Sequence, residues 1–315
     1  MSQPRQVSEK TFSTFSKSQS AAYAAARFDY TPLLYNTVLA HHVTTSGAHD
    51  LVLDIGCGPG QAARGFAPHF HTTIGLDPSP NMIITARELT TEPAANNESS
   101  KQSTIRFDVS AAEELGANLN PPVAEHSVDL LVAANAAHWF DMPRFWEAAK
   151  RAVKPGGTVA LWTTGEGAIA PETPNAVKIQ AALDRYVTEH LEPYYEQGNW
   201  LTKDRYASLK MPWDVGVEGF DQGTSLRRDW EPTERWVNAP QEAPLDMFEM
   251  LMASASPQIR WYEAHPGVKG TDGDVLKSVR GEIEELLREA GVEKGREMIK
   301  GFPRGALLMV KRTSS

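Results

Sequence analysis

The stretch Leu51-Val-Leu-Asp-Ile-Gly-Cys-Gly-Pro-Gly60 joins a short apolar run to three glycines at alternate positions. The run predicts a buried strand, and the glycines predict a tight turn that opens a helix near residues 60–68. Because glycine has no Cβ, such a turn lets a ligand approach the bare backbone. The spacing differs from the dinucleotide fingerprint G-x-G-x-x-G, whose third glycine would stand at Gln61, and no P-loop Lys-Ser or Lys-Thr follows. The turn therefore predicts a site for a nucleoside without a pyrophosphate.

Four further apolar runs follow, at residues 72–77, 104–109, 128–133 and 157–162, with helical candidates near 79–91 and 141–152. Strands that alternate with helices predict a mostly parallel sheet with helices on both faces. Asp77 ends the second run, where an acidic side chain can accept hydrogen bonds from both ribose hydroxyls. Residues 91–104, rich in Ser, Asn, Glu and Thr, predict a solvated loop.

After Trp162 the alternation stops for roughly 95 residues rich in Trp, Tyr and Pro, which we interpret as a cap. Apolar positions at helical spacing predict a helix within 173–191, and 213–231 can hold one further strand. A stripe from Val275 to Leu287 predicts a helix that stops at Gly291, and residues 306–310 predict the last strand. The expected division is a lid at 1–30, a cofactor-binding core at 31–163, a cap with one core strand at 164–260, and the core's last helix and strand at 261–315.

The composition excludes several classes of protein and of binding partner. The 31 Lys and Arg against 40 Asp and Glu give a net charge of −9, which excludes a non-specific nucleic-acid binder. The single cysteine, Cys57, excludes an intramolecular disulfide and a thiolate-rich metal site, and no metal is expected. No apolar run approaches 18 residues and residues 1–19 are polar, so we expect neither a membrane span nor a secretion signal, and we expect a cytoplasmic location. The expected partner is a small molecule, and the oligomeric state stays open.

Several motifs together resemble one family. Asp54-Ile-Gly-Cys-Gly-Pro-Gly60 with Gly75-Leu-Asp77 is similar to the first two motifs of class I S-adenosylmethionine-dependent methyltransferases. Ala137-His-Trp-Phe-Asp141, Lys154-Pro-Gly-Gly157 and Pro193-Tyr-Tyr-Glu-Gln197 resemble the fungal trans-aconitate methyltransferase branch. The resemblance implies S-adenosylmethionine as cofactor and a Rossmann-like α/β fold. In that fold a seven-stranded sheet has the order 3-2-1-4-5-7-6, the last strand is antiparallel, and the cap follows strand 5. It also implies a small-molecule acceptor, with a role in secondary metabolism.

The motif and the resemblance together assign two sets of site residues. The cofactor-binding set is Tyr23, Arg27, Asp54, Gly56, Gly58, Gly60, Asp77, Pro78, Met82, Ser110, Ala111 and Asn135. The substrate-binding set is Trp139, Phe140, Trp162, Tyr195 and Trp200.

The chain departs from its relatives at two places. Ser110 and Ala111 stand where many relatives have an Asp that contacts adenine, so backbone groups or the Ser110 hydroxyl are expected to read the base. Ser254-Ala-Ser-Pro257 lacks a tryptophan that relatives carry in the cap, which weakens any transfer of their substrate to this chain.

The chemistry of methyl transfer leaves the acceptor atom open. An acceptor carboxylate is already ionised and needs no base, whereas a hydroxyl or amine is helped by one, for which His138 is the candidate. Two alternatives share the cofactor site: a non-methylating rearrangement or cyclisation aided by the sulfonium, and a methyltransferase-like subunit that regulates a partner. The intact glycine turn and Asp77 argue against the regulatory subunit, because such a module can lose them freely.

Overall fold

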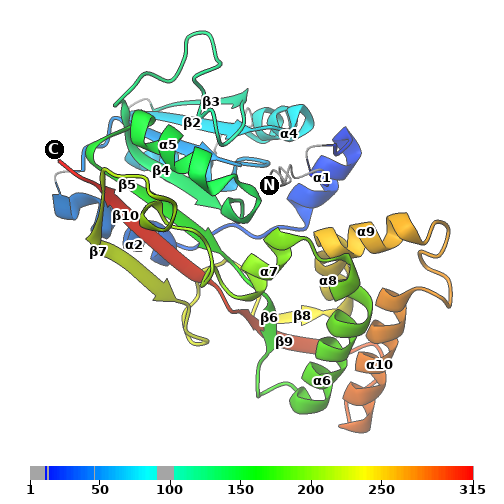
Figure 1. Cartoon of the computed structure of the whole chain (residues 1–315). Helices are drawn as coiled ribbons and strands as arrows, with labels where there is room; N and C mark the ends of the chain where they lie inside the picture. Colours follow the sequence, from blue (N-terminus) through cyan, green and yellow to red (C-terminus); the bar gives the residue numbers. More distant parts are fainter. Residues whose placement is uncertain (1–10, 13, 46, 91–102, 315) are drawn as a thin grey trace, which may run out of the picture.

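The computed structural model describes residues 11–12, 14–45, 47–90 and 103–314. Most of the expected loop at 91–104 and the first ten residues of the expected lid lie outside this part of the chain. Figure 1 shows two lobes, a core lobe built on a large sheet and a second lobe built on a small sheet and a group of helices.

The sheet of the core lobe has seven strands in the order β3-β2-β1-β4-β5-β10-β7. Strands β1 to β5 are parallel, and β10 is antiparallel to both β5 and β7. This arrangement confirms the expected order 3-2-1-4-5-7-6 with an antiparallel last strand. The strands are β1 (Leu51–Ile55), β2 (Thr72–Asp77), β3 (Thr104–Val109), β4 (Val128–Ala134), β5 (Val153–Thr163), β7 (Phe220–Asp229) and β10 (Ala306–Arg312).

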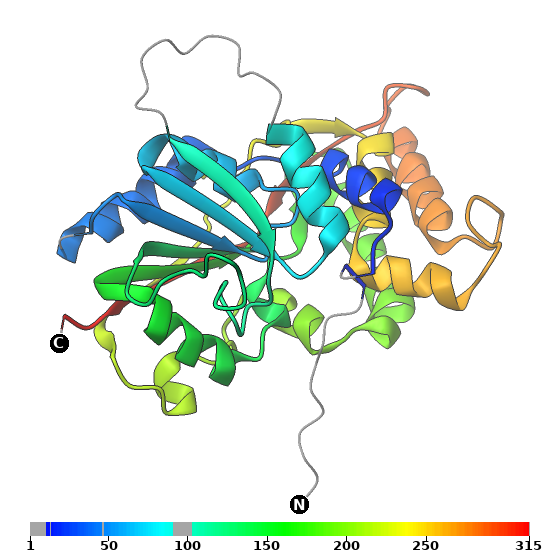
Figure 2. The same ribbon diagram turned by 90° about the horizontal axis from the view of Figure 1, so that it is seen from above.

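Helices lie on both faces of this sheet (Figures 1 and 2). Adjacent residues of β1 point to opposite faces, so that Val52 joins the hydrophobic cluster beneath α2 and α3, and Leu53 joins the cluster beneath α5. Burial on both faces explains why the central strands are continuous apolar runs rather than alternating ones. The helices are α1 (Lys17–Ala25), α2 (Pro32–His42), α3 (Gln61–Phe66), α4 (Pro80–Thr90) and α5 (Met142–Ala152).

The second lobe, here called the cap lobe, has its own small sheet and its own hydrophobic core. The sheet has the order β6-β9-β8, with β9 antiparallel to both neighbours. The elements of the lobe are β6 (Gly167–Ile169), β8 (Glu242–Pro244), β9 (Met298–Pro303), α6 (Ala176–Tyr186), α7 (Gln197–Lys203), α8 (Leu245–Ala253), α9 (Ser256–Ala264) and α10 (Val275–Glu289). The sequence did not predict this sheet, because two of its strands, β6 and β8, have only three residues each, too few to show a periodicity.

Helix α10 was expected to complete the core but belongs to the cap lobe. Its apolar stripe, which includes Leu276 and Ile283, packs in one cluster with Ile179 of α6 and Phe248 of α8. The stripe predicts a buried face, whereas the partner of that face is set by the path of the chain. Strand β9 runs from the cap lobe almost directly into β10, so the same C-terminal segment serves both sheets (Figure 1).

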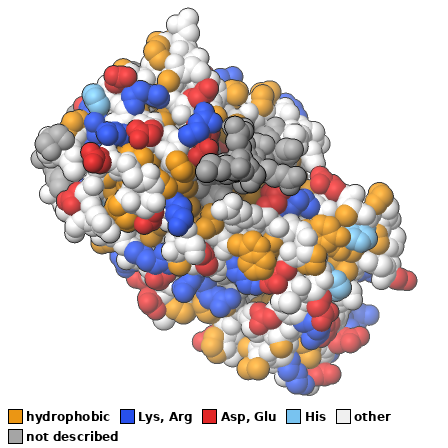
Figure 3. Space-filling model, viewed as in Figure 1, with side chains coloured by type: hydrophobic (Ala, Val, Ile, Leu, Met, Phe, Trp, Pro, Cys, Tyr) orange, Lys and Arg blue, Asp and Glu red, His pale blue; other side chains and the backbone are white. Residues whose placement is uncertain are grey.

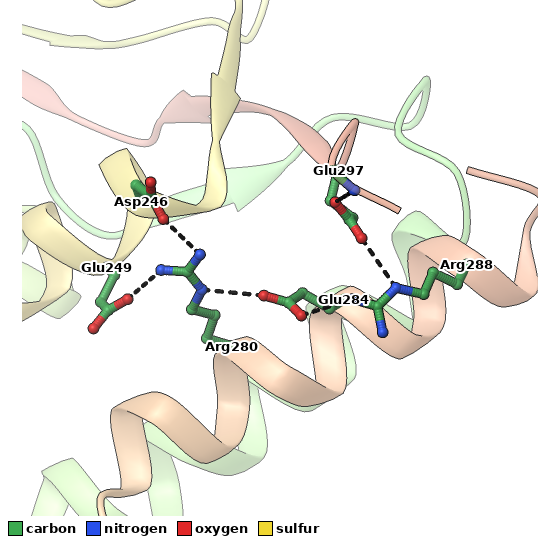
Figure 4. Close-up of polar contacts among 7 residues, drawn as sticks. Asp246, Glu249, Arg280, Glu284, Arg288 and Glu297 are labelled. Atoms are coloured by element: carbon green, nitrogen blue, oxygen red, sulfur yellow. Dashed lines mark hydrogen bonds and ion pairs between the residues drawn. The ribbon is translucent and has the colours of Figure 1, made fainter. Parts of the chain in front are cut away.

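Ion pairs join α8, α10 and the segment that leads into β9 (Figure 4). Arg280 pairs with Asp246 and Glu249 of α8 and with Glu284 one turn along α10. Arg288 pairs with Glu284 at 2.9 Å and with Glu297 at 3.0 Å. Single surface pairs contribute little, but a network that links two helices favours one arrangement of the cap lobe.

Single-turn segments complete the fold. They are the 3-10 turns Val43–Thr45, Ala67–His69, Ala137–Trp139, Glu192–Tyr194 and Pro212–Val215, and a π-helical segment, Val187–Leu191, that extends α6.

Acidic and basic side chains are interspersed over the face seen in Figure 3. In the described part of the chain, every helix is too short or too polar to cross a bilayer.

Candidate functional site

A cavity of about 950 Å³ lies between the core lobe and the cap lobe. Its core wall contains the turn after β1, the start of α4, and the segment from β4 to Phe140. Its cap wall contains parts of β6, α6, α7, α8 and β9. The volume is near the top of the range of about 300–1,000 Å³ for small-molecule sites. It leaves room for two ligands side by side.

The glycine turn forms the part of the core wall nearest to β1. Gly56 has φ +66°, and a Cβ there would stand 2.5 Å from the Cβ of Ala136, so only glycine fits this position. Asp54 lies buried behind the turn, and its Oδ2 accepts a hydrogen bond from the backbone N–H of Ala63 at 2.9 Å. Its Oδ1 is buried with no hydrogen-bond partner among the described residues, and burial raises the pKa of this carboxyl to about 8.

Asp77 is fixed at the carboxyl end of β2 by backbone groups. Its Oδ2 accepts from the N–H of Gly58 at 2.9 Å, and its Oδ1 accepts from the N–H of Ser79 at 2.8 Å. A carboxylate oxygen accepts more than one hydrogen bond, so these contacts orient Asp77 without preventing it from binding a ligand hydroxyl. Asp77, Pro78 and Met82 together line the cavity.

The lid brings aromatic and cationic side chains to the same cavity. Tyr23 and Arg27 line it, with the Arg27 guanidinium 4.6 Å from the centre of the Tyr23 ring. The Nε of Arg27 is buried without a hydrogen-bond partner among the described residues. Phe12, which the sequence analysis did not single out, also lines the cavity and packs edge-on against Tyr23 and Trp139. Its only signal in the sequence is an aromatic residue within a polar stretch.

His138 lies on the 3-10 turn after β4 and lines the cavity. Its Nδ1 is 2.7 Å from the hydroxyl oxygen of Tyr206, a buried residue that sequence reasoning missed. Burial lowers the pKa of His138 to about 3 and raises the pKa of Tyr206, so both groups are neutral at physiological pH. The imidazole is therefore arranged as a neutral hydrogen-bonding group, and taking a proton there is unfavourable.

Comparison with known proteins identifies the chain. A family model described as a methyltransferase domain matches residues 53–161. A Dictyostelium discoideum protein named as a methyltransferase is 32% identical over 279 residues, which cover 86% of this chain and 84% of that protein. The chain belongs to the class I S-adenosylmethionine-dependent methyltransferases. Methyltransferase cfoB of Aspergillus candidus is 27% identical, with 90% of this chain and 93% of that protein covered.

Likeness to a solved structure agrees with the fold of this methyltransferase. A structure assigned to a type II methyltransferase from Anaeromyxobacter dehalogenans aligns with a TM-score of 0.57 at 22% identity. The alignment covers 91% of this chain and 97% of that chain. This likeness shows the α/β class I methyltransferase fold, while the family model and the relatives show the enzyme class and S-adenosylmethionine as its cofactor.

Three features of the methyltransferase cavity fit this cofactor. The glycine turn offers bare backbone, and the Asp77 carboxylate beside it lines the cavity and can accept hydrogen bonds from ligand hydroxyls. The Nε of Arg27, buried without a hydrogen-bond partner among the described residues, seeks an acceptor. The carboxylate at the amino-acid end of the cofactor is such an acceptor.

Most of the predicted site residues meet at the cavity. Those that line it are Tyr23, Arg27, Gly56, Gly58, Asp77, Pro78, Met82, Ala111, Asn135, His138, Trp139, Phe140 and Tyr195. Asn135 is itself held in place, since its Oδ1 accepts from the N–H of Thr164 and its Nδ2 donates to the hydroxyl of Tyr30. Asp54 and Gly60 stand behind the wall and shape the turn.

Three predicted residues lie elsewhere. Ser110 is buried, and its hydroxyl donates to Asn118 Oδ1 at 2.8 Å and accepts from the N–H of Gly116 at 3.0 Å, so it orders its own loop instead of facing the cavity. Trp162 is fully buried in the core against the rings of Tyr30 and Phe66.

Trp200 is 48% exposed, packs edge-on against Tyr195 and is not among the residues that line the cavity. Aromatic type alone could not separate these two tryptophans from Trp139, because the same ring suits a core, a surface or a pocket.

Proposed function

We propose that this methyltransferase moves the methyl group of S-adenosylmethionine to an oxygen or nitrogen of a small organic molecule held under the cap lobe. One observation carries the proposal: the glycine turn with Asp77 and the wall of the cap lobe belong to the same cavity. Two ligands in one enclosed space can be aligned for an in-line displacement. Such alignment can supply about 7–11 kcal/mol of the barrier reduction.

The cofactor supplies an electrophilic methyl group on a sulfonium, and the residues of the core wall have distinct tasks. Asp77 is proposed to accept hydrogen bonds from the ribose hydroxyls, and Arg27 to pair with the carboxylate of the amino-acid end. The wall at Ala111, beside Met82, is proposed to receive the adenine, read by backbone groups because the Ser110 hydroxyl is engaged elsewhere. Trp139 and Phe140 are proposed to exclude water between cofactor and acceptor.

The state of His138 favours an acceptor that is already deprotonated. A hydroxyl would have to leave its proton on an imidazole that burial keeps neutral, whereas a carboxylate is ionised at pH 7 without help. A carboxylate acceptor also agrees with the resemblance to trans-aconitate methyltransferases. An acceptor from secondary metabolism and a cytoplasmic location stay predictions.

Calorimetry with S-adenosylhomocysteine, followed by a screen with labelled cofactor against carboxylic acids, phenols and amines, tests the proposal. Binding of the product and labelling of at least one class are expected. Gly56→Ala should lose both, because its methyl group would collide with Ala136, and Gly281→Ala on α10 should retain both. Absence of binding, or binding without labelling of any class, would contradict methyl transfer to a small molecule.

A further inference from the structure

The cap wall of the cavity is mostly aliphatic. Side chains from four elements meet there: Ile169 of β6, Leu183 of α6, Phe248 and Leu251 of α8, and Ile299 of β9. Phe248 and Ile299 are at the same time members of the hydrophobic core of the lobe, so the cavity opens directly onto that core. A void beside such side chains forfeits the dispersion contacts that a close-packed interior would make. An apolar ligand would restore them.

Among the described residues, the acidic and the basic side chains of the cap wall are equal in number. The described wall on the cap side carries two acids, Glu166 and Asp184, and two bases, Lys203 and Arg304. Lys203 already forms an ion pair with Glu192. A polycarboxylate would need a surplus of cations to replace its hydration. The described cap wall carries no such surplus.

The acids are also partly engaged. Glu166 Oε1 accepts a hydrogen bond from the Tyr195 hydroxyl at 3.0 Å, and Asp184 Oδ1 accepts from the Gln180 amide at 2.8 Å. The wall is therefore best matched by a ligand whose recognition rests on apolar area, with polar groups confined to one end.

We propose that the methyl acceptor has an extended apolar body that lies along Ile169, Leu183, Leu251 and Ile299, with its reactive polar end toward Trp139. The inference rests on the proposed function and deepens it. It separates this chain from an enzyme for a tricarboxylate such as trans-aconitate, whose acceptor has three charges and little apolar area.

The test measures binding to the full chain saturated with S-adenosylhomocysteine. Calorimetric titrations use hexanoate, octanoate and decanoate, the matching n-alkylamines, and trans-aconitate. Each buried methylene should tighten binding about fourfold, so two methylenes should lower Kd about 15-fold with either head group. trans-Aconitate should bind more weakly than decanoate.

Variants keep the result specific to the cap wall. Leu251→Asn should weaken decanoate binding at least tenfold and leave the affinity for S-adenosylhomocysteine unchanged, while Leu251→Met should retain the chain-length dependence. The control is Leu226→Asn, on the exposed outer strand β7, which should change neither affinity. A Kd independent of chain length, or tighter binding of trans-aconitate than of decanoate, would overturn the inference and leave the proposed function standing. Failure to bind S-adenosylhomocysteine would overturn both.

Discussion

Asp77 both holds the backbone around the cavity in place and presents a carboxylate to the cavity. It accepts hydrogen bonds from the N–H groups of Gly58 and Ser79, and so joins the glycine turn to the beginning of α4. Its carboxylate is thereby aimed by the backbone before any ligand arrives. Preorganisation of this kind lowers the cost of ordering the site on binding.

Replacing Asp77 with Ala should weaken cofactor affinity by about 1–3 kcal/mol, because a charge-assisted hydrogen bond is lost. Calorimetry with S-adenosylhomocysteine measures the change. Asp272→Ala serves as the control, since Asp272 is fully exposed in the cap lobe. Equal affinity in the wild type and the Asp77 variant would remove Asp77 from the site.

His138 should stay neutral over the whole physiological range. Its folded-state pKa of about 3 lies below the ordinary 6.5 because burial disfavours the imidazolium, so protonation is expected only in strong acid. NMR titration of the ring should show no change between pH 8 and 5, and kcat/KM for an ionised acceptor should be flat across that range. A log-linear loss of rate below about pH 6.5 that disappears in His138→Gln would instead make His138 the proton acceptor.

At the scale of elements, α7 determines how the cap lobe meets the core wall. Gly198 of α7 lies against the turn that carries His138 and Trp139, and a Cβ there would stand 2.7 Å from the Trp139 ring. The close approach of helix to ring is possible because this position has no side chain. Helix α7 thus joins the cap lobe to the turn that forms part of the core wall.

Gly198→Ala and Gly281→Ala should change stability in opposite directions. The first should lower the free energy of unfolding by about 1–3 kcal/mol through overpacking, and should also reduce activity because Trp139 must shift. The second should raise it by about 0.5–1 kcal/mol, because a Cβ at Gly281 meets no described atom within 4 Å and alanine favours the helix. Urea unfolding monitors both, and destabilisation by Gly281→Ala or stabilisation by Gly198→Ala would contradict this packing.

Segments from both ends of the chain tie the two lobes together. Strands β9 and β10 carry one segment of chain from the small sheet to the large one (Figure 1). The lid joins the lobes on the other side: Asn81 of α4 donates to the carbonyl of Phe15, and Arg260 of α9 donates to the hydroxyl of Thr11. Figure 2 shows α1 between α4 and α9. The cavity is thus closed by segments distant in sequence.

Stability of the whole molecule should depend on pH through buried groups. His42 is fully buried, and its Nε2 donates to the carbonyl of Ala48, so its Nδ1 accepts from the hydroxyl of Thr158. Burial lowers the pKa of His42 from 6.5 to about 4. Because the unfolded chain takes up this proton first, the free energy of unfolding should fall as the pH falls from 6.5 toward 4.

Comparison of the wild type with His42→Gln isolates the contribution of His42 to the pH dependence of stability. The raised pKa of Asp54, about 8, makes stability rise as the pH falls, but this contribution is the same in both proteins and cancels in the comparison. Between pH 7.5 and 5 the wild type should lose about 2 kcal/mol more than the variant. Chemical denaturation at the two pH values measures the difference. Equal changes in the two proteins would show that His42 titrates normally in the folded state.

The sequence by itself determined the strands and helices of the core lobe and the position of the glycine turn. Glycines after an apolar strand, Asp77 at the end of the next strand, and continuous apolar runs are local consequences of φ, of strand ends and of burial on both faces. These properties need no knowledge of distant contacts. The strand order and the cofactor came from the resemblance that these same residues carry.

Only the tertiary structure decided which side chains face the cavity and what its outer wall is made of. Trp139 and Trp162 are chemically alike, yet one lines the cavity and the other lies in the core, because their surroundings come from segments far away in the chain. Long-range packing also brings Tyr206 into hydrogen-bond contact with His138. It likewise brings Leu183, Leu251 and Ile299 to one wall of the cavity. Periodicity shows that a helix has a buried face, but the path of the whole chain determines what that face is buried against.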